Sequence, residues 1–352
     1  MPRQSRQNPL IREFVLRNLD NHPADIASVV AAKFGLSRAA ANGYLQRLTA
    51  EGLIQADGVT RARRYSLRPT VFIKETIKLS EGLWEDAVWR FRIQPHVINL
   101  KKNIAEICHH GFTEILNNAI DHSGSQYAVI SFVVTYASAK ITIADSGIGI
   151  FQKIQNDFRL QDAREALFEL SKGGLTSNPA KHAGEGIFYT SRMFDEFGIL
   201  SGDLYYSRKK IDDDDWLIEV QDTSDSAGTL VKMEISTSAD WTMEEVFDRY
   251  KVDRVRFKKT HIPLSIGQYP GEQLVSRSQA KRILSRFSKY SEIMLDFHGV
   301  EKIGQAFADE VFRVYQIDHP DVKIVFIRAN DEIRKMIEYV KTTQAEIEPK
   351  FL

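Results

Sequence analysis

Two segments decide the fold of the middle of the chain: GFTEILNNAIDHS, residues 111–123, and KITIADSGIGI, residues 140–150. Apolar residues recur in the first segment at the spacing of a helix, which predicts that one side of it packs against a core. Glu114 and Asn118 are four residues apart and therefore share a face of this helix. Both side chains need partners there, because burying a polar group without hydrogen bonds is costly.

The second segment predicts a strand of alternating apolar residues that ends at Asp145 and opens into a glycine-containing turn. A carboxylate at the end of a strand can accept a hydrogen bond from the amino group of adenine. Gly147 and Gly149 allow the backbone to approach a ligand closely. These residue types favour a binding site for a small polar ligand at this strand end.

Two further segments have the composition of phosphate and ligand loops. KGGLTSNPAKHAGEGIFYTSRMFD, residues 172–195, starts rich in Gly, Ser and Lys and then becomes helical. Gly184 and Gly186 precede that helix, whose N-terminus carries free N–H groups and a positive dipole end that attract phosphate. SAGTLVKMEI, residues 226–235, places Thr229 at the start of another alternating strand.

In this order the four segments resemble the nucleotide site of the GHKL superfamily, which includes gyrase-type topoisomerases, heat-shock chaperone ATPases, histidine kinases and anti-sigma kinases. The resemblance covers roughly residues 85–240. It implies a Bergerat α/β sandwich, with a mixed, mostly antiparallel sheet covered by helices on one face. ATP and Mg²⁺ are the implied cofactors.

The resemblance also implies roles for single residues. Asn118 would hold Mg²⁺ through its side-chain oxygen, Asp145 would read the adenine amine, and Thr229 would support the adenine side. Lys172 is expected either to neutralise phosphate charge or to be solvated. The other residues expected around the nucleotide are Asp121, Gly147, Gly149, Gly184 and Gly186.

Glu114 is the candidate catalytic residue, because the usual histidine kinases carry Asn at this position whereas ATPases and anti-sigma kinases carry Glu. A carboxylate there can orient or deprotonate an attacking water or hydroxyl group. The spacing Glu114-x-x-x-Asn118-Ala119-x-x-His122 is similar to that of the anti-sigma serine kinases. Three hypotheses follow: a slow ATPase that acts as a switch, a serine/threonine kinase for a separate partner, or a nucleotide-binding scaffold without chemistry.

The N-terminal part of the chain is basic although the whole chain is neutral. Residues 1–70 contain 11 Lys and Arg against 5 Asp and Glu, whereas the full chain has 47 of each. Three amphipathic helical segments and a hairpin signal at Asp57-Gly58 resemble a winged helix-turn-helix domain over residues 8–68, which implies DNA binding. The alternative is a helical docking module with a solvated basic face. The residues expected at DNA are Arg38, Asn42, Gln46 and Arg47 in the third helix, and Arg61, Arg63 and Arg64 in the wing.

The C-terminal part alternates strands and helices. SEIMLDFHGVEKIGQAFADEVFRVY, residues 291–315, and VKIVFIRAN, residues 322–330, predict a small α/β layer. This part resembles STAS-like domains, relatives of anti-sigma-factor antagonists, over roughly residues 262–345. In those antagonists an Asp-Ser-Ser-Gly turn receives phosphate. The corresponding stretch here, residues 304–307, reads Gly-Gln-Ala-Phe and offers no hydroxyl, so a docking or sensing role is expected instead.

These patterns predict a multidomain α+β protein with a winged helix at 1–70, a GHKL domain with an N-terminal connector at 71–251 and a STAS-like domain at 252–352. The lone Cys108 excludes a disulfide framework and a cysteine zinc site. No apolar run approaches the ~20 residues of a membrane span, and the N-terminus lacks the apolar centre of a signal peptide. We expect a cytoplasmic, ATP-dependent transcription regulator. Its expected partners are ATP or ADP, DNA, a regulatory protein and, as a homodimer, a second copy.

Overall fold

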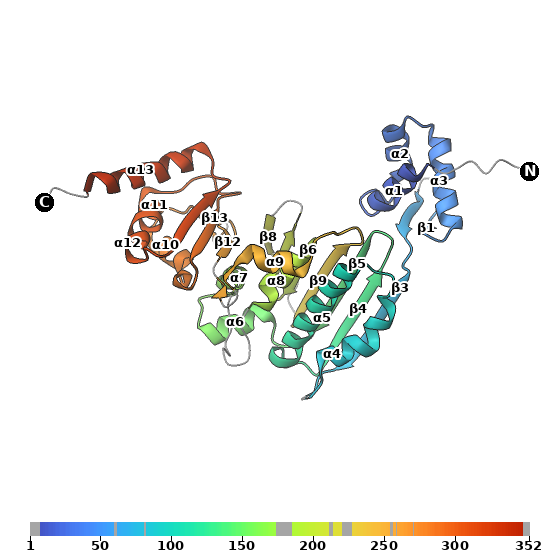
Figure 1. Ribbon diagram of the computed structural model, residues 1–352, viewed down its shortest axis with the longest axis horizontal. Coiled ribbons are helices and arrows are strands. Elements are labelled where there is room, and N and C mark those ends of the chain that lie inside the picture. Colours follow the sequence, from blue (N-terminus) through green and yellow to red (C-terminus); the bar gives the residue numbers. More distant parts are fainter. Residues whose placement is uncertain are drawn as a thin grey trace, which may run out of the picture.

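The structure is a computed structural model, and it describes residues 8–59, 62–80, 82–173, 185–210, 214–219, 227–253, 256–257, 259–269 and 271–347. Figure 1 shows a helical unit near the N-terminus, a large central sheet with helices over it, and an α/β unit near the C-terminus. The chain is therefore a mixed α/β protein, as its sequence predicts.

The N-terminal unit has a core of its own. Its elements are α1 (Pro9–Asn18), α2 (Ile26–Phe34), α3 (Arg38–Ala50), β1 (Ile54–Asp57) and β2 (Arg64–Leu67). Their apolar faces enclose a cluster in which Val15 and Leu45 are fully buried. Local chemistry sets the helix ends: Gly35 is left-handed after α2, and the Ser37 side chain accepts a hydrogen bond from the Ala40 N–H at the start of α3. Strands β1 and β2 pair antiparallel, as the hairpin signal predicts.

The central unit is built on one large antiparallel sheet. Within the described residues its seven strands lie in the order β3, β4, β5, β9, β6, β7, β8, with bounds Val71–Lys78, Tyr127–Val134, Ser138–Asp145, Thr229–Ser236, Glu196–Ser201, Leu204–Lys209 and Asp214–Glu219. Each neighbouring pair of these strands is antiparallel, which agrees with the mostly antiparallel sheet expected from the sequence. The parallel pairing that would make the sheet mixed does not occur among the described strands. Short connections such as that between β4 and β5 reverse the direction of the chain, so the strands that they join pair antiparallel.

Strand β3 lies where the sequence predicts only a connector. It pairs with β4 along its whole length, from Val71 opposite Val134 to Lys78 opposite Tyr127. Its residues alternate between half-buried and exposed, as in a strand at the edge of a sheet with one covered face. Because β3 begins directly after the N-terminal unit, that unit is tied to the edge of the central sheet.

Helices cover one face of this sheet (Figure 1). Their bounds are Glu85–Val88 (α4), Trp89–Ile93 (a π-helical turn), Gln94–His96 (a 3₁₀ turn), Lys102–His122 (α5), Ile150–Phe158 (α6), Ala163–Lys172 (α7), Gly186–Met193 (α8) and Met243–Tyr250 (α9). Helix α5 starts well before the predicted residue Gly111, and Phe112 and Leu116 bury its apolar side. A Cβ atom at Gly111 would lie 2.5 Å from the Phe194 ring, so the missing side chain lets α5 approach its neighbours closely.

The C-terminal unit contains a parallel sheet. Strands β12 (Lys259–Pro263), β13 (Glu292–Asp296) and β14 (Lys323–Ile327) pair in this order. The other elements are β10 (Lys251–Asp253), β11 (Arg256–Phe257), α10 (Arg277–Leu284), a 3₁₀ turn (Phe287–Lys289), α11 (Gln305–Asp309), a π-helical turn (Glu310–Val314), α12 (Tyr315–Asp318) and α13 (Asp331–Ile347). The sequence does not predict β12. The apolar core of this unit is continuous with that of the central unit, in contrast to the separate core of the N-terminal unit.

Candidate functional site

A cavity of about 420 Å³ lies between α5, the end of β5, the start of β9, helix α6 and the first turn of α8. Part of its wall is apolar, with Ile115, Ile143 and Val231 among the lining residues. The polar part includes Glu114 and Asn118 from α5. A pocket with an apolar wall and a few converging polar groups is the common form of a small-ligand site.

The end of β5 brings a carboxylate to the cavity. Asp145 is half-buried, and one of its oxygens accepts a hydrogen bond from the Gly147 N–H at 2.9 Å. Burial raises the pKa of Asp145, and hydrogen bonds from the backbone of Gly147 and Thr229 oppose that rise. The carboxylate is thus held in a fixed orientation at the cavity wall.

Two glycines allow close approaches around this site. A Cβ atom at Gly147 would lie 2.0 Å from the Ser123 carbonyl oxygen, at the end of α5. A Cβ atom at Gly186 would lie 2.0 Å from a carboxylate oxygen of Glu114. A side chain at residue 186 would therefore displace the Glu114 carboxylate from the position that it has beside the first turn of α8.

Most residues that the sequence predicts for the nucleotide reach this cavity. Glu114, Asn118, Asp145, Gly149, Gly186 and Thr229 all line it. The Thr229 hydroxyl accepts a hydrogen bond from the Ile150 N–H at 2.9 Å, which joins the start of β9 to the start of α6. Gly147 does not line the cavity, but its N–H donates a hydrogen bond to Asp145. Asp121 is exposed at the end of α5 and does not line the cavity. Gly184 lies outside the described residues.

Lys172 has a different position from the one predicted. It is fully buried at the end of α7, outside the cavity lining, and its ammonium group lies 2.5 Å from a carboxylate oxygen of Glu169. It also donates a hydrogen bond to the Ser285 carbonyl oxygen at 3.1 Å. Burial lowers the pKa of Lys172, and the charge of Glu169 opposes that effect. Lys172 is neither solvated nor placed at the cavity, because packing of the C-terminal unit encloses it.

His110 lines the cavity although it is absent from the predicted site. It lies one turn before Glu114 on α5, so the spacing of four residues is the signal that identifies it. Its ring meets Phe247 edge-on at 5.9 Å, and within the described part of the chain its Nε2 atom has no hydrogen-bond partner. Burial, together with the charge of His109, lowers the pKa of His110 to about 4.

The described residues contain no cluster of three or more His, Cys, Asp or Glu side chains that could hold a metal ion. Asn118 lies in the cavity, where its amide oxygen is of the type that Mg²⁺ accepts alongside substrate phosphates. Its magnesium role therefore stays a prediction.

The basic residues expected at DNA are spread over α3 and the hairpin. Arg38, Gln46, Arg63 and Arg64 are exposed, whereas Asn42 and Arg47 are half-buried. The Arg47 guanidinium lies 4.5 Å from the centre of the Tyr44 ring and donates to the Gly43 carbonyl oxygen. Arg61 lies outside the described residues.

Comparison with known proteins supports the C-terminal assignment. Residues 279–334 match the family described as a STAS-like domain of unknown function (DUF4325). A search of curated proteins found no match to this chain. The matched residues include residues 304–307, which form the start of α11. None of the described helices is long and apolar enough to cross a membrane.

We predict that His110 makes the protein less stable in mild acid. In the folded state the ring stays neutral down to about pH 4, whereas an unfolded histidine binds a proton near pH 6.5. The unfolded state therefore gains protons first, and stability falls as the pH drops from about 6.5 to 4. His110→Gln should remove up to about 3 kcal/mol of that fall, measured by urea unfolding at several pH values.

His96→Gln is the matched control, because His96 is exposed. It should retain the wild-type pH dependence. An identical loss of stability in acid for wild type and His110→Gln would contradict the prediction.

Proposed function

We propose that this chain is a GHKL-type protein that binds ATP with Mg²⁺ between α5 and the end of β5, and that the nucleotide controls binding of DNA or of a protein partner. One observation carries this proposal. Glu114, Asn118, Asp145, Gly186 and Thr229 come from four segments far apart in the sequence, and they line one cavity. An antiparallel sheet with helices over one face is compatible with the proposed fold.

The cavity suits an adenine ring. Asp145 presents a carboxylate oxygen that can accept a hydrogen bond from an exocyclic amine, and Ile143 and Val231 offer apolar surface to a flat ring. Because the Gly147 N–H already orients this carboxylate, little conformational entropy is lost when a ligand binds. In this proposal Asp145 selects adenine over a base with a carbonyl group at the same position.

The remaining residues fit a triphosphate and its metal ion. Helix α8 starts at Gly186 beside the cavity, so its first N–H groups and dipole favour anionic groups there. The Asn118 amide oxygen would complete the coordination of Mg²⁺, and the bound ion would neutralise phosphate charge. Glu114 would orient the attacking water and accept its proton at a carboxylate oxygen.

Serine/threonine kinase activity is the second candidate. His122 lines the same cavity as Glu114 and Asn118, so the complete motif that resembles the anti-sigma serine kinases faces one site. In that case Glu114 would accept the proton of a hydroxyl group on a partner protein. The stretch at residues 304–307 of the STAS-like domain carries no hydroxyl, so that domain would serve as a docking or sensing unit.

We further propose that the N-terminal unit is a winged helix that binds DNA. Its three helices and hairpin have the required order, and the side chains of Arg38, Gln46, Arg63 and Arg64 are exposed. Exposed arginines on a hairpin can reach phosphates beside a groove that holds the preceding helix.

Asp145→Asn should weaken ATP binding about tenfold or more, because the charged acceptor for the adenine amine is replaced by a neutral amide. Isothermal titration with ATP and with inosine triphosphate measures the effect. Inosine carries a carbonyl group where adenine carries the amine, so it serves as the internal control. The wild type should prefer ATP and the variant should lose most of this preference. Equal discrimination in both proteins would contradict the role of Asp145.

Glu114→Gln should retain ATP binding and lower phosphoryl transfer by about 10²-fold or more, because the amide cannot accept a proton. Single-turnover reactions with γ-labelled ATP and Mg²⁺ separate the hypotheses: free phosphate indicates an ATPase, and label on an added partner protein indicates a kinase. Glu106→Gln is the control, because Glu106 is exposed on the same helix and outside the cavity lining. Transfer that is equal in Glu114→Gln and wild type would exclude Glu114 as the base.

Replacing Arg63 and Arg64 together by alanine should weaken binding to all duplex DNA sequences by a similar factor. Each lost phosphate contact should reduce the slope of log affinity against log salt by about 0.9. Fluorescence anisotropy at several salt concentrations measures both effects. Lys335→Ala, an exposed lysine on α13, should change neither. If the variant keeps the wild-type dependence of affinity on salt, the hairpin does not contact DNA phosphates.

A further inference from the structure

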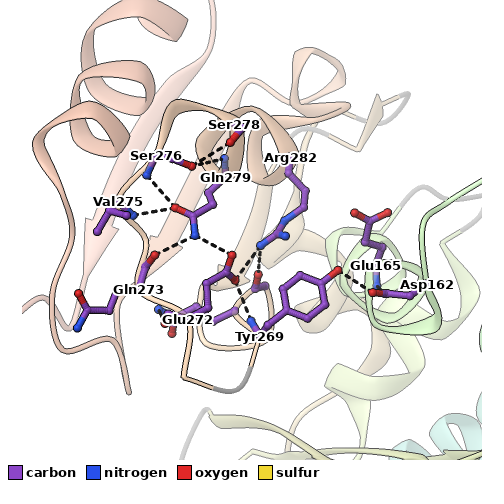
Figure 2. A network of polar contacts seen from close by, with 12 residues as sticks. Asp162, Glu165, Tyr269, Glu272, Gln273, Val275, Ser276, Ser278, Gln279 and Arg282 are labelled. Atoms are coloured by element: carbon purple, nitrogen blue, oxygen red, sulfur yellow. Dashed lines mark hydrogen bonds and ion pairs between the residues drawn. The ribbon is translucent and has the colours of Figure 1, made fainter.

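The C-terminal unit holds helix α7 at its N-terminal end. Asp162 caps this helix, and one of its oxygens accepts a hydrogen bond from the Glu165 N–H at 2.9 Å. The other oxygen accepts a hydrogen bond from the Tyr269 hydroxyl at 2.7 Å. Figure 2 shows this contact between the cap of α7 and a loop of the C-terminal unit.

Tyr269 is itself fixed by a polar network (Figure 2). Its N–H donates to Glu272 at 2.9 Å, and the same carboxylate accepts hydrogen bonds from Arg282 at 3.0 Å and from Gln279 at 2.7 Å. Gln279 also closes the capping box of α10 with Ser276. The cap of α7 is therefore connected to the cap of α10 through hydrogen bonds at every step.

The other end of α7 is held by buried contacts. The Tyr290 hydroxyl lies 2.7 Å from the Lys172 carbonyl oxygen and 2.6 Å from that of Gly173, and it shares its proton between them. The Thr260 hydroxyl donates to the Lys172 oxygen at 2.8 Å. The Lys172 ammonium group in turn caps the end of α10 at Ser285. Lys172 of α7 thus supplies a partner for the end of α10, and Tyr290 and Thr260 of the C-terminal unit supply partners for the last carbonyl groups of α7.

Helices α6 and α7 form part of the wall of the candidate nucleotide cavity. Leu170 of α7 and Phe158 of α6 both line it. Arg286 of the C-terminal unit lies with its guanidinium 4.5 Å from the centre of the Phe158 ring, and it pairs with Glu169 at 3.8 Å. Arg286 adopts a left-handed backbone with φ of 63°, a conformation that costs energy in a residue other than glycine.

We propose that Arg286 and Tyr290 of the STAS-like unit are positioning residues for the nucleotide cavity, and that nucleotide binding and docking of this unit are thermodynamically coupled. Neither residue lines the cavity. Tyr290 fixes the end of α7, and Arg286 supports the outer side of the Phe158 wall. Because coupling is reciprocal, a bound nucleotide strengthens the contacts of Arg286 and Tyr290. This inference rests on the proposed nucleotide binding.

The test uses the full chain with two variants. Tyr290→Phe removes only the hydroxyl group, and Arg286→Gly removes the guanidinium at a position where glycine relieves the backbone strain. Each should raise the Kd for ATP about tenfold, measured by isothermal titration. Tyr315→Phe is the control in the same unit, because the Tyr315 hydroxyl has no hydrogen-bond partner in the described part of the chain. It should leave the Kd unchanged.

Hydrogen exchange provides a second measurement, because a purely structural role of Arg286 and Tyr290 would not make their exchange rates depend on bound ATP. In the wild type, ATP should slow exchange at residues 286–290, which lie outside the cavity, and this slowing should shrink in both variants. The inference is overturned if both folded variants bind ATP with wild-type affinity. It is also overturned if bound ATP does not change hydrogen exchange at residues 286–290. Either result leaves the proposed function intact. A wild-type chain that binds no ATP would overturn both.

Discussion

Helix α5 has to serve two environments at once, and the rest of the central unit is arranged around this constraint. One side is apolar and packs on the sheet through residues such as Phe112 and Leu116. His110, Glu114 and Asn118 recur every four residues and face the cavity. An α-helix has about 3.6 residues per turn, so an apolar stripe and a polar stripe can run side by side along it over several turns. Any shift of the helix would displace both sides together, and the absence of a side chain at Gly111 and Gly186 leaves room for the elements that pack closely around it.

The sequence predicts those parts of the structure that depend on local chemistry. Gly147, two residues after Asp145, and the N-cap at Ser37 lie where turn and capping rules place them, and α8 starts at Gly186, where the sequence predicts a helix start. Most of the residues predicted for the nucleotide line one cavity, because four short segments appear in a known order. His110 is not among the predicted residues, because its spacing of four residues from Glu114 is informative only once Glu114 is known to face a cavity. Strand β3 was missed because its pairing partner β4 is distant in the sequence.

Lys172 shows why local sequence patterns do not predict the rest of the structure. A lysine beside a glycine-rich segment has the composition of a phosphate loop, and nothing nearby reveals that a domain a hundred residues later encloses it. Its burial is acceptable only because Glu169 and the Ser285 carbonyl group are in place. Removing one partner of such a buried pair commonly costs about 3–5 kcal/mol. The lysine therefore contributes to the specific docking of two units, and its charge is unavailable to a ligand in the cavity.

The two outer units are joined to the centre in physically different ways. The N-terminal unit meets the central sheet largely through polar contacts near the surface, such as the Tyr136 hydroxyl to Glu13 at 2.7 Å and Lys140 to Asp20 at 3.3 Å, and Ala137 packs against its core. Exposed ion pairs contribute only about 0–1 kcal/mol each, so these polar contacts oppose a change in the orientation of this unit only weakly. The C-terminal unit shares a continuous apolar core with the centre, and separating the two would expose that core to water. In the proposed switch, the STAS-like unit therefore stays attached to the part of the chain that holds the nucleotide, and the bound nucleotide strengthens that attachment. The N-terminal unit is the part that changes its orientation.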